Sequence, residues 1–219
     1  MAEYGEIIKD FKSKKYAPIY FLHGEESFFI NNIVALFENE LLDKSQKSFN
    51  QYILYGKEID IPEIITTARK FPMMGDQQLI VVKEAQDIKD WKKTQSIEAL
   101  LHYLKTPVPS TILVFAYQHK LLDKRSKLAK VLTKTSMMME SKKIYDNQIG
   151  PWIQSYLKTK SLRMNQKGIM MLSENIGNNL QRLSSEIDKM AINITKGQEI
   201  DEQHIQNYVG INRDYNIFE

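Results

Sequence analysis

A turn near the N-terminus is the first place where the residue types could do chemistry, because doubly wound folds bind phosphate where a strand passes into a helix. This turn reads Gly24-Glu25-Glu26-Ser27 and follows an apolar run at 19–22. A phosphate-binding loop needs further glycines and a lysine, so that backbone N–H groups and a positive charge surround the phosphates. Two adjacent carboxylates repel a polyanion instead. We therefore expect a degenerate phosphate turn without a bound nucleotide, whose acidic residues favour a helix N-terminus.

A second unusual segment is apolar and lies in a connection, where polar residues are common. It reads Phe71-Pro72-Met73-Met74-Gly75. The segment could be a buried loop that packs against the core. It could also be a protruding hydrophobic tip that fits a pocket of a partner, a use for which the flexible side chain of methionine is well suited. The residues alone leave both interpretations open.

A third segment is basic. Residues 120–143 contain eight lysines and arginines but only two acidic residues, whereas the whole chain has a net charge of only +3. A helix over 121–134 would present several of these lysines on one face, where they could contact DNA phosphates. A solvated helix face explains the same pattern, and no aromatic residue interleaves to stack on bases. The lysines predicted to share the face are Lys120, Lys124, Lys127 and Lys134.

Motifs of common enzymes are missing from the sequence. It contains no GxSxG, HExxH or GxGxxG pattern, its four histidines are scattered, and it has no cysteine. We therefore expect no catalytic residue, no metal site and no cofactor. The lack of cysteine is typical of a reducing cytoplasm. No apolar run approaches the roughly 20 residues of a membrane span, so we expect no membrane partner.

Alternating strands and helices must position these three segments. Continuous apolar runs indicate buried strands, and apolar residues with a period of 3.6 indicate helices between them. This alternation over about the first 145 residues predicts an α/β fold with a mostly parallel sheet and helices on both faces. The predicted strands are 19–22, 49–55, 79–82, 111–116 and 136–139, and the predicted helices include 27–40, 61–70, 87–105 and 121–134.

The remaining residues form a second region in which only helical periodicity continues. Apolar residues recur with spacings of 3, 4, 3 and 4 from Leu180 to Ile194. Gly197 then predicts the end of this helix, and Asp201 predicts the cap of a short fourth helix. We therefore expect an α/β domain over 1–144 and a small all-α domain within 145–219.

Four segments of the chain together carry a family resemblance. They are PIYFLHGEESFFI at 18–30, FPMMGDQQLIVVKEAQ at 71–86, TILVFAYQHKLLDKRSKLAK at 111–130 and NNLQRLSSEIDKM at 178–190. In this order they resemble the delta subunit of the bacterial DNA polymerase III clamp loader. The resemblance implies an AAA+-like domain, related to the P-loop NTPases, that has lost its nucleotide site, followed by a helical lid domain. It also implies that the chain is truncated just where a third, C-terminal collar domain would begin.

The same resemblance implies a function in DNA replication. Members are non-catalytic subunits of a DNA-directed DNA polymerase complex that bind and open the ring-shaped sliding clamp, the beta subunit, and help to load it at primer-template DNA. Apolar residues that follow the fourth helix insert into the clamp, and Phe71, Met73 and Met74 occupy that position here. Met73-Met74 replaces the usual Leu-Phe or Phe-Phe pair. The other clamp-loader subunits are expected partners through the collar domain.

Two other functions stay open at the level of the residues. One is a nucleotide-binding α/β ATPase, which would bind ATP at Gly24-Glu25-Glu26-Ser27. The other is an unrelated α/β protein-interaction module, which would not bind a sliding clamp.

Overall fold

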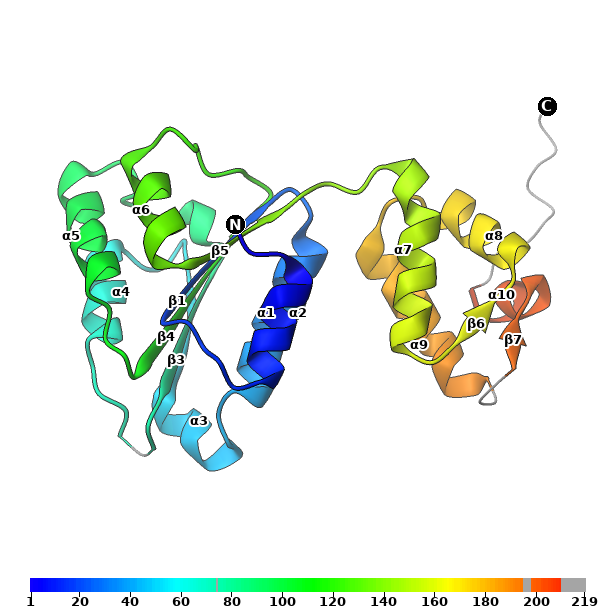
Figure 1. Cartoon of the computed structure of the whole chain (residues 1–219), viewed down its shortest axis with the longest axis horizontal. Helices are drawn as coiled ribbons and strands as arrows, with labels where there is room; N and C mark the ends of the chain where they lie inside the picture. The colour runs from blue at the N-terminus through cyan, green and yellow to red at the C-terminus, as the bar shows by residue number, and fades with distance from the viewer. Residues whose placement is uncertain (74, 195–197, 210–219) are drawn as a thin grey trace. The chain divides into compact units, whose positions relative to one another are not determined.

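A five-stranded parallel sheet has the strand order β2-β3-β4-β1-β5 (Figure 1). The structure is a computed structural model and describes residues 1–73, 75–194 and 198–209. The strands are β1 (Ile19–Gly24), β2 (Gln51–Tyr55), β3 (Gln78–Lys83), β4 (Thr111–Gln118) and β5 (Met137–Ser141). The predicted α/β fold with a mostly parallel sheet is confirmed.

The central strands bury both of their faces, which explains their uninterrupted apolar runs. Phe21 of β1 packs in one core with Ile80 of β3, whereas Tyr20 packs in a second core with Val81. Successive side chains of a strand point to opposite faces of the sheet. A strand that is covered on both sides therefore needs apolar residues at consecutive positions.

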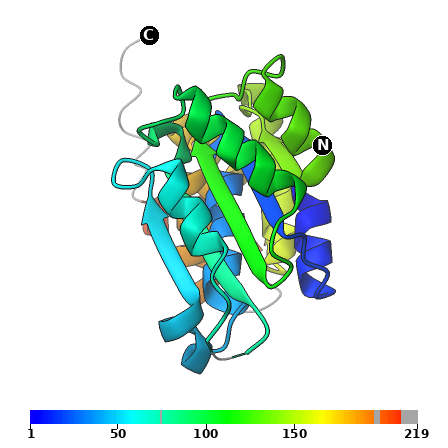
Figure 2. The same cartoon turned by 90° about the vertical axis from the view of Figure 1, so that its left-hand side faces the viewer.

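Helices cover both faces of this sheet. They are α1 (Tyr4–Lys12), α2 (Ser27–Glu40), α3 (Lys44–Asn50), α4 (Ile61–Ala68), α5 (Thr94–Lys105) and α6 (Lys127–Thr135). α1 and α2 pack in the core that contains Tyr20, and α4, α5 and α6 pack in the core that contains Phe21. Figure 2 shows α4 and α5, in cyan-green and green, in front of the strands. α3 is absent from the sequence prediction, and Phe49 belongs to it rather than to β2.

The helix predicted over 87–105 begins only at Thr94. A short 3-10 helix, η1 (Ala85–Asp87), and a turn precede it. In that turn the buried carboxylate of Asp90 accepts a hydrogen bond from the Ile61 N–H of α4 at 3.0 Å. A contact between residues this far apart in the sequence leaves no periodic pattern, so the sequence could not show it.

The basic helix predicted over 121–134 begins only at Lys127. Ser126 caps it, because its hydroxyl accepts a hydrogen bond from the backbone N–H three residues later at 3.1 Å. Lys120 and Lys124 lie in the connection before this cap. The prediction that all four lysines share one helix face is therefore wrong.

A second compact unit begins at Ile144 and follows a first unit of residues 1–143. Its helices are α7 (Asp146–Thr159), α8 (Gln166–Ile176), α9 (Leu180–Asn193) and α10 (Glu202–Val209). A short parallel pair of strands, β6 (Arg163–Met164) and β7 (Glu199–Ile200), adds to the helices, so the expectation of helices alone is incomplete. The predicted stop at Gly197 lies outside the described residues. No helix in the described ranges is long and apolar enough to cross a membrane.

Candidate functional site

The connection between α4 and β3 exposes large apolar side chains. We call residues 70–77 the apolar tip. Phe71 is 79% exposed and Met73 is 74% exposed, so two large apolar side chains lie at the surface close together in one connection. Of the two interpretations left open by the sequence, the buried loop therefore does not hold for Phe71 and Met73. Met74 lies outside the described residues.

Buried polar side chains hold the start of the apolar tip. The last carbonyls of a helix have no partner within the helix and need other donors. The Gln78 side-chain amide of β3 donates to the Lys70 carbonyl at 2.6 Å, and the Thr111 hydroxyl of β4 donates to the Ala68 carbonyl at 2.9 Å. Gln78 also donates to the Thr111 hydroxyl at 2.6 Å. Since Gln78 and Thr111 are buried, the tip starts from a fixed position on the sheet.

A third polar side chain reaches the middle of the apolar tip from α3. The Asn50 side-chain oxygen accepts a hydrogen bond from the Met73 N–H at 2.8 Å, and Asn50 is only 1% exposed. Gly75 follows with φ +98°, a backbone conformation that favours glycine, and a Cβ at this position would overlap the Gln46 side chain of α3. Sequence reasoning missed Asn50 and Gln78. Their only signal is a polar residue at the edge of an apolar segment.

The degenerate phosphate turn lies at the opposite end of the strands, after β1. Two backbone donors at this turn already have partners, because the Glu26 N–H donates to the Ser141 carbonyl at 3.3 Å and the Phe28 N–H donates to the Glu26 carboxylate at 2.9 Å. Gly24 has φ +146°, and a Cβ on it would overlap the Ser141 backbone. The turn is thus filled by β5 from one side and capped by its own carboxylate. These N–H groups cannot also surround a phosphate.

His23 lies directly before the turn and is fully buried. Its Nδ1 accepts a hydrogen bond from the Leu122 N–H at 3.4 Å. Burial lowers the pKa of His23, and the Lys124 charge lowers it further, while the nearby Glu140 opposes this shift. Lys124 pairs with Glu140 at 2.7 Å, and this hydrogen bond is the main reason that the pKa of Glu140 is lowered. The connection before α6 is therefore fastened to β1 and β5.

The basic face of α6 consists of different residues from those predicted. Lys127, Lys130 and Lys134 are exposed and recur with spacings of 3 and 4, so they share one face of the helix. The sequence prediction left out Lys130, and it included Lys120 and Lys124 because it started the helix too early. Lys124 is committed to Glu140, and the backbone of Lys120 forms an isolated antiparallel bridge with Gly24. The structure thus brings together only two of the four predicted lysines.

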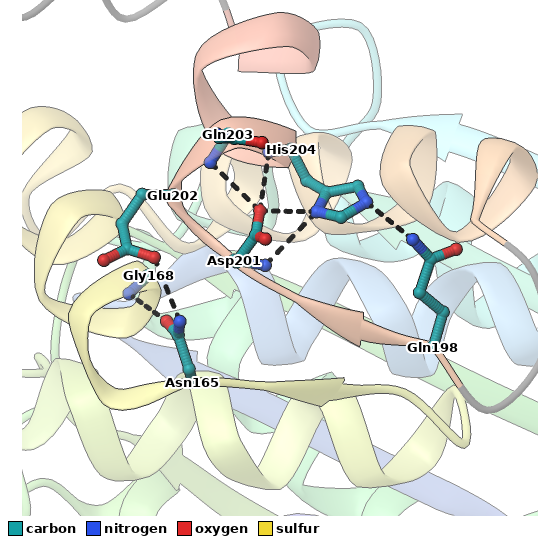
Figure 3. A network of polar contacts seen from close by, with 7 residues as sticks. All are labelled: Asn165, Gly168, Gln198, Asp201, Glu202, Gln203 and His204. Carbon is teal, nitrogen blue, oxygen red and sulfur yellow. Dashed lines mark hydrogen bonds and ion pairs between the residues drawn. The ribbon is translucent and has the colours of Figure 1, made fainter.

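A polar network in the second unit contains the remaining candidate for chemistry, His204 (Figure 3). Asp201 accepts hydrogen bonds from the His204 N–H at 3.1 Å and from the Gln203 N–H at 3.0 Å, and it contacts His204 Nδ1 at 2.6 Å. These backbone hydrogen bonds cap α10, as the sequence predicts for Asp201, and the bond from His204 is the main reason that the pKa of Asp201 is lowered. The other ring nitrogen of His204 lies 2.9 Å from the Gln198 side-chain amide. This partner is no nucleophile, so the network stabilises the helix rather than forming a triad.

Metal binding has no visible basis in the described parts of the chain. No group of three or more histidine, aspartate or glutamate residues lies close enough together there to hold a metal ion. Among the described residues the apolar tip stands out instead, because it exposes two large apolar side chains, Phe71 and Met73.

Comparisons with known proteins give one consistent result. The family model described as "DNA polymerase III, delta subunit" matches residues 20–142. The DNA polymerase III subunit delta of Bacillus subtilis (strain 168) is 28% identical over 218 residues, which is 98% of this chain and 63% of that protein. The chain thus spans less than two thirds of the length of this relative.

Solved structures agree with the sequence comparison. The Bacillus subtilis DNA clamp loader delta protein (YqeN) matches 94% of this chain and 62% of its own, with a TM-score of 0.78 and 26% identity. A point mutant of Thermotoga maritima RuvB matches 93% of this chain and 65% of its own, with a TM-score of 0.50 and 8% identity. The similarity to RuvB concerns the fold alone.

Proposed function

The chain belongs to the DNA polymerase III delta subunit family, and on that premise we propose that it binds the sliding clamp through its apolar tip and helps to open it for loading onto primed DNA. In this proposal the chain itself is not catalytic. Related subunits of the loader supply ATP hydrolysis, and further subunits assemble with the whole protein through a collar domain.

The observation that carries this proposal is the exposure of Phe71 and Met73 on a rigid base. Exposed apolar surface on a folded protein commonly marks an interaction site. Interfaces concentrate their energy in a few side chains that fill a pocket, and a protruding pair of large apolar groups suits that arrangement. Methionine adapts its shape to the pocket because its side chain is unbranched and polarizable.

The degenerate phosphate turn argues against the alternative of an active ATPase. Glu26 and Phe28 use their N–H groups within the protein, and two carboxylates stand where the phosphates would be. A phosphate site needs free N–H donors and positive charge. A partner that binds at the other end of the strands needs neither.

Equilibrium binding of the chain to the purified sliding clamp, by surface plasmon resonance, tests the proposal. We expect saturable binding that Phe71→Ala weakens about tenfold or more, because an anchor residue is lost. Ile192→Ala is the matched control, since Ile192 is another exposed large apolar side chain (84%) but lies on α9 in the second unit. The proposal is wrong if the chain does not bind the clamp, or if the two variants bind equally well.

A second proposal concerns DNA and rests on the basic face of α6. Lys127, Lys130 and Lys134 are exposed together, so this face can contact DNA phosphates in the assembled loader. Replacing Lys127 and Lys134 with glutamate should reduce the log–log salt slope of DNA binding by about one per lost contact. The control changes Lys9 and Lys12 of α1, which are also exposed, in the same way. An unchanged slope would favour a solvated face.

A further inference from the structure

The apolar tip is fastened to a short helix that lies far from it in the sequence. Asn50 ends α3, and its side chain accepts the Met73 N–H across 23 residues of chain. Figures 1 and 2 show α3 beside the connection between α4 and β3. We propose that Asn50 is a positioning residue of the clamp-binding site, which holds the backbone of Met73 so that Phe71 and Met73 are presented in one arrangement before the clamp binds. This inference rests on the proposed function.

The burial of Asn50 is the first argument for this role. Asn50 is 1% exposed and is the buried residue of α3, whereas the Met73 side chain is 74% exposed. Burying an amide is unfavourable unless it is hydrogen-bonded. One hydrogen bond of the Asn50 side-chain oxygen comes from the backbone N–H of the exposed residue, Met73. The hydrogen bond therefore fixes the backbone of Met73 and leaves its side chain available to a partner.

A second contact from the same face of α3 lies on the other side of Met73. Gln46 precedes Asn50 by four residues, a spacing that places both on one helix face. The Gln46 side chain packs so closely against Gly75 that a Cβ there would overlap it. Gly75 also has φ +98°, which turns the chain back toward β3. α3 thus contacts the apolar tip both at Met73 and two residues later.

Holding the apolar tip before binding has a direct consequence for affinity. A free loop loses backbone entropy when it docks, and for each residue that becomes fixed this is worth about five- to thirtyfold in affinity. A loop that is already held does not lose this entropy on docking, which is the principle of preorganisation. Asn50 therefore contributes to clamp affinity without touching the clamp.

The variant Asn50→Ala tests the role in the whole 219-residue chain. We expect the Kd for the purified sliding clamp to rise about fivefold or more, and amide hydrogen exchange at Met73 in the unbound chain to become faster by a similar factor. Asn165→Ala is the matched control, because the Asn165 side chain also accepts one backbone N–H, that of Gly168 at 2.7 Å, but in the second unit. Both variants are measured at a temperature at which they are folded. The control should leave the Kd and the Met73 exchange rate unchanged.

A double-mutant cycle separates positioning from a general loss of stability. If Asn50 acts by presenting Phe71 and Met73, then Asn50→Ala should weaken binding much less in a background that carries both Phe71→Ala and Met73→Ala than in the original chain. An equal effect of Asn50→Ala in the two backgrounds would overturn the inference, as would an unchanged exchange rate at Met73 in Asn50→Ala. Equal clamp affinity of the original chain and Asn50→Ala would overturn this inference alone. Absence of clamp binding by the original chain would overturn the proposed function as well.

Discussion

Two connections at opposite ends of the same sheet differ in almost every respect. The turn Gly24–Ser27 follows β1, carries two carboxylates and is filled by the Ser141 backbone. The apolar tip precedes β3 and exposes Phe71 and Met73. Ligands of open α/β sheets ordinarily bind beyond the carboxyl ends of the strands. In this chain the turn after β1 is filled from within the protein, whereas the exposed side chains of Phe71 and Met73 lie at the amino end of β3.

Both connections have hydrogen bonds between backbone and side-chain groups, yet with opposite results. In the turn, the Glu26 carboxylate accepts the N–H of Phe28 and so removes a donor that a phosphate would need. In the apolar tip, the buried side-chain amides of Asn50 and Gln78 bond to the backbone, and the side chains of Phe71 and Met73 are exposed. Hydrogen bonds to the backbone thus have two different effects. Where N–H groups would have to bind a phosphate, they remove the donors, whereas in a segment with exposed side chains they fix the backbone that carries those side chains.

The largest expected effect is a loss of stability caused by Gly24→Ala in the turn after β1. The new Cβ would overlap the Ser141 backbone, and φ +146° is strained for alanine. Backbone strain and overpacking together should lower the free energy of unfolding by about 3 kcal/mol or more. Chemical denaturation monitored by circular dichroism measures this change. Gly5→Ala is the control, since nothing lies within 4 Å of a Cβ there. Equal stability of the two variants would mean that the turn is not closed by β5.

The next largest effect is a loss of clamp affinity caused by Met73→Ala combined with Met74→Ala in the apolar tip. Loss of anchor side chains should weaken clamp binding by about 2 kcal/mol or more, roughly thirtyfold. The melting temperature should hardly change, because Met73 is 74% exposed and contributes little to the core. Calorimetry and clamp binding, measured on the same variant, distinguish exposed anchor residues from buried core residues. Normal affinity with a clear loss of stability, which a buried methionine would give, would remove both residues from the site.

A smaller effect concerns pH and the buried His23 beside the closed turn. Burial lowers the pKa of His23, so the unfolded chain takes up a proton at a higher pH than the folded chain does. The free energy of unfolding should therefore fall as the pH drops below about 6.5, by at most about 1.4 kcal/mol per pH unit for one group. His23→Gln should flatten this dependence, whereas His102→Gln, a change of an exposed histidine on α5, should not. Equal pH slopes for both variants would contradict the assignment.

The smallest expected effect is that of ATP, which should be nil. A ligand that binds the folded state raises the melting temperature according to its concentration relative to Kd. Millimolar MgATP should leave the melting temperature of the chain unchanged, because the Glu26 and Phe28 N–H groups donate within the protein and the turn has no lysine. Glu26→Lys should not create a site, since the further glycines are still missing. A rise in melting temperature with ATP would reopen the ATPase interpretation.

Much of the α/β fold could be predicted from the sequence, because strands that are buried on both faces need apolar residues at consecutive positions. The runs at 19–22, 79–82 and 111–116 are parts of β1, β3 and β4, and α2 spans residues 27–40 as expected. α3 could not be predicted in the same way. It is short and mostly polar, and its buried residue, Asn50, finds its hydrogen-bond partner 23 residues later.

The position of the candidate site in the chain could be predicted from the sequence, but the exposure of its side chains could not. Two methionines between proline and glycine mark the segment at 71–75, yet the same residues would suit a buried loop. Exposure depends on which groups hold the backbone, and those are Gln78 and Asn50, which periodicity does not reveal. The prediction of the basic face was wrong for a related reason. Ser126 caps α6, so the helix begins at Lys127, and Lys120 and Lys124 lie before it.

The most direct test of the central claim is a hydrogen-exchange footprint of the chain with and without the sliding clamp. The account predicts that the clamp slows amide exchange in the apolar tip and in α3, which lies against it, and leaves the turn at Gly24–Ser27 unchanged. Slower exchange at the turn, with no change in the apolar tip, would contradict the claim that the apolar tip is the binding site.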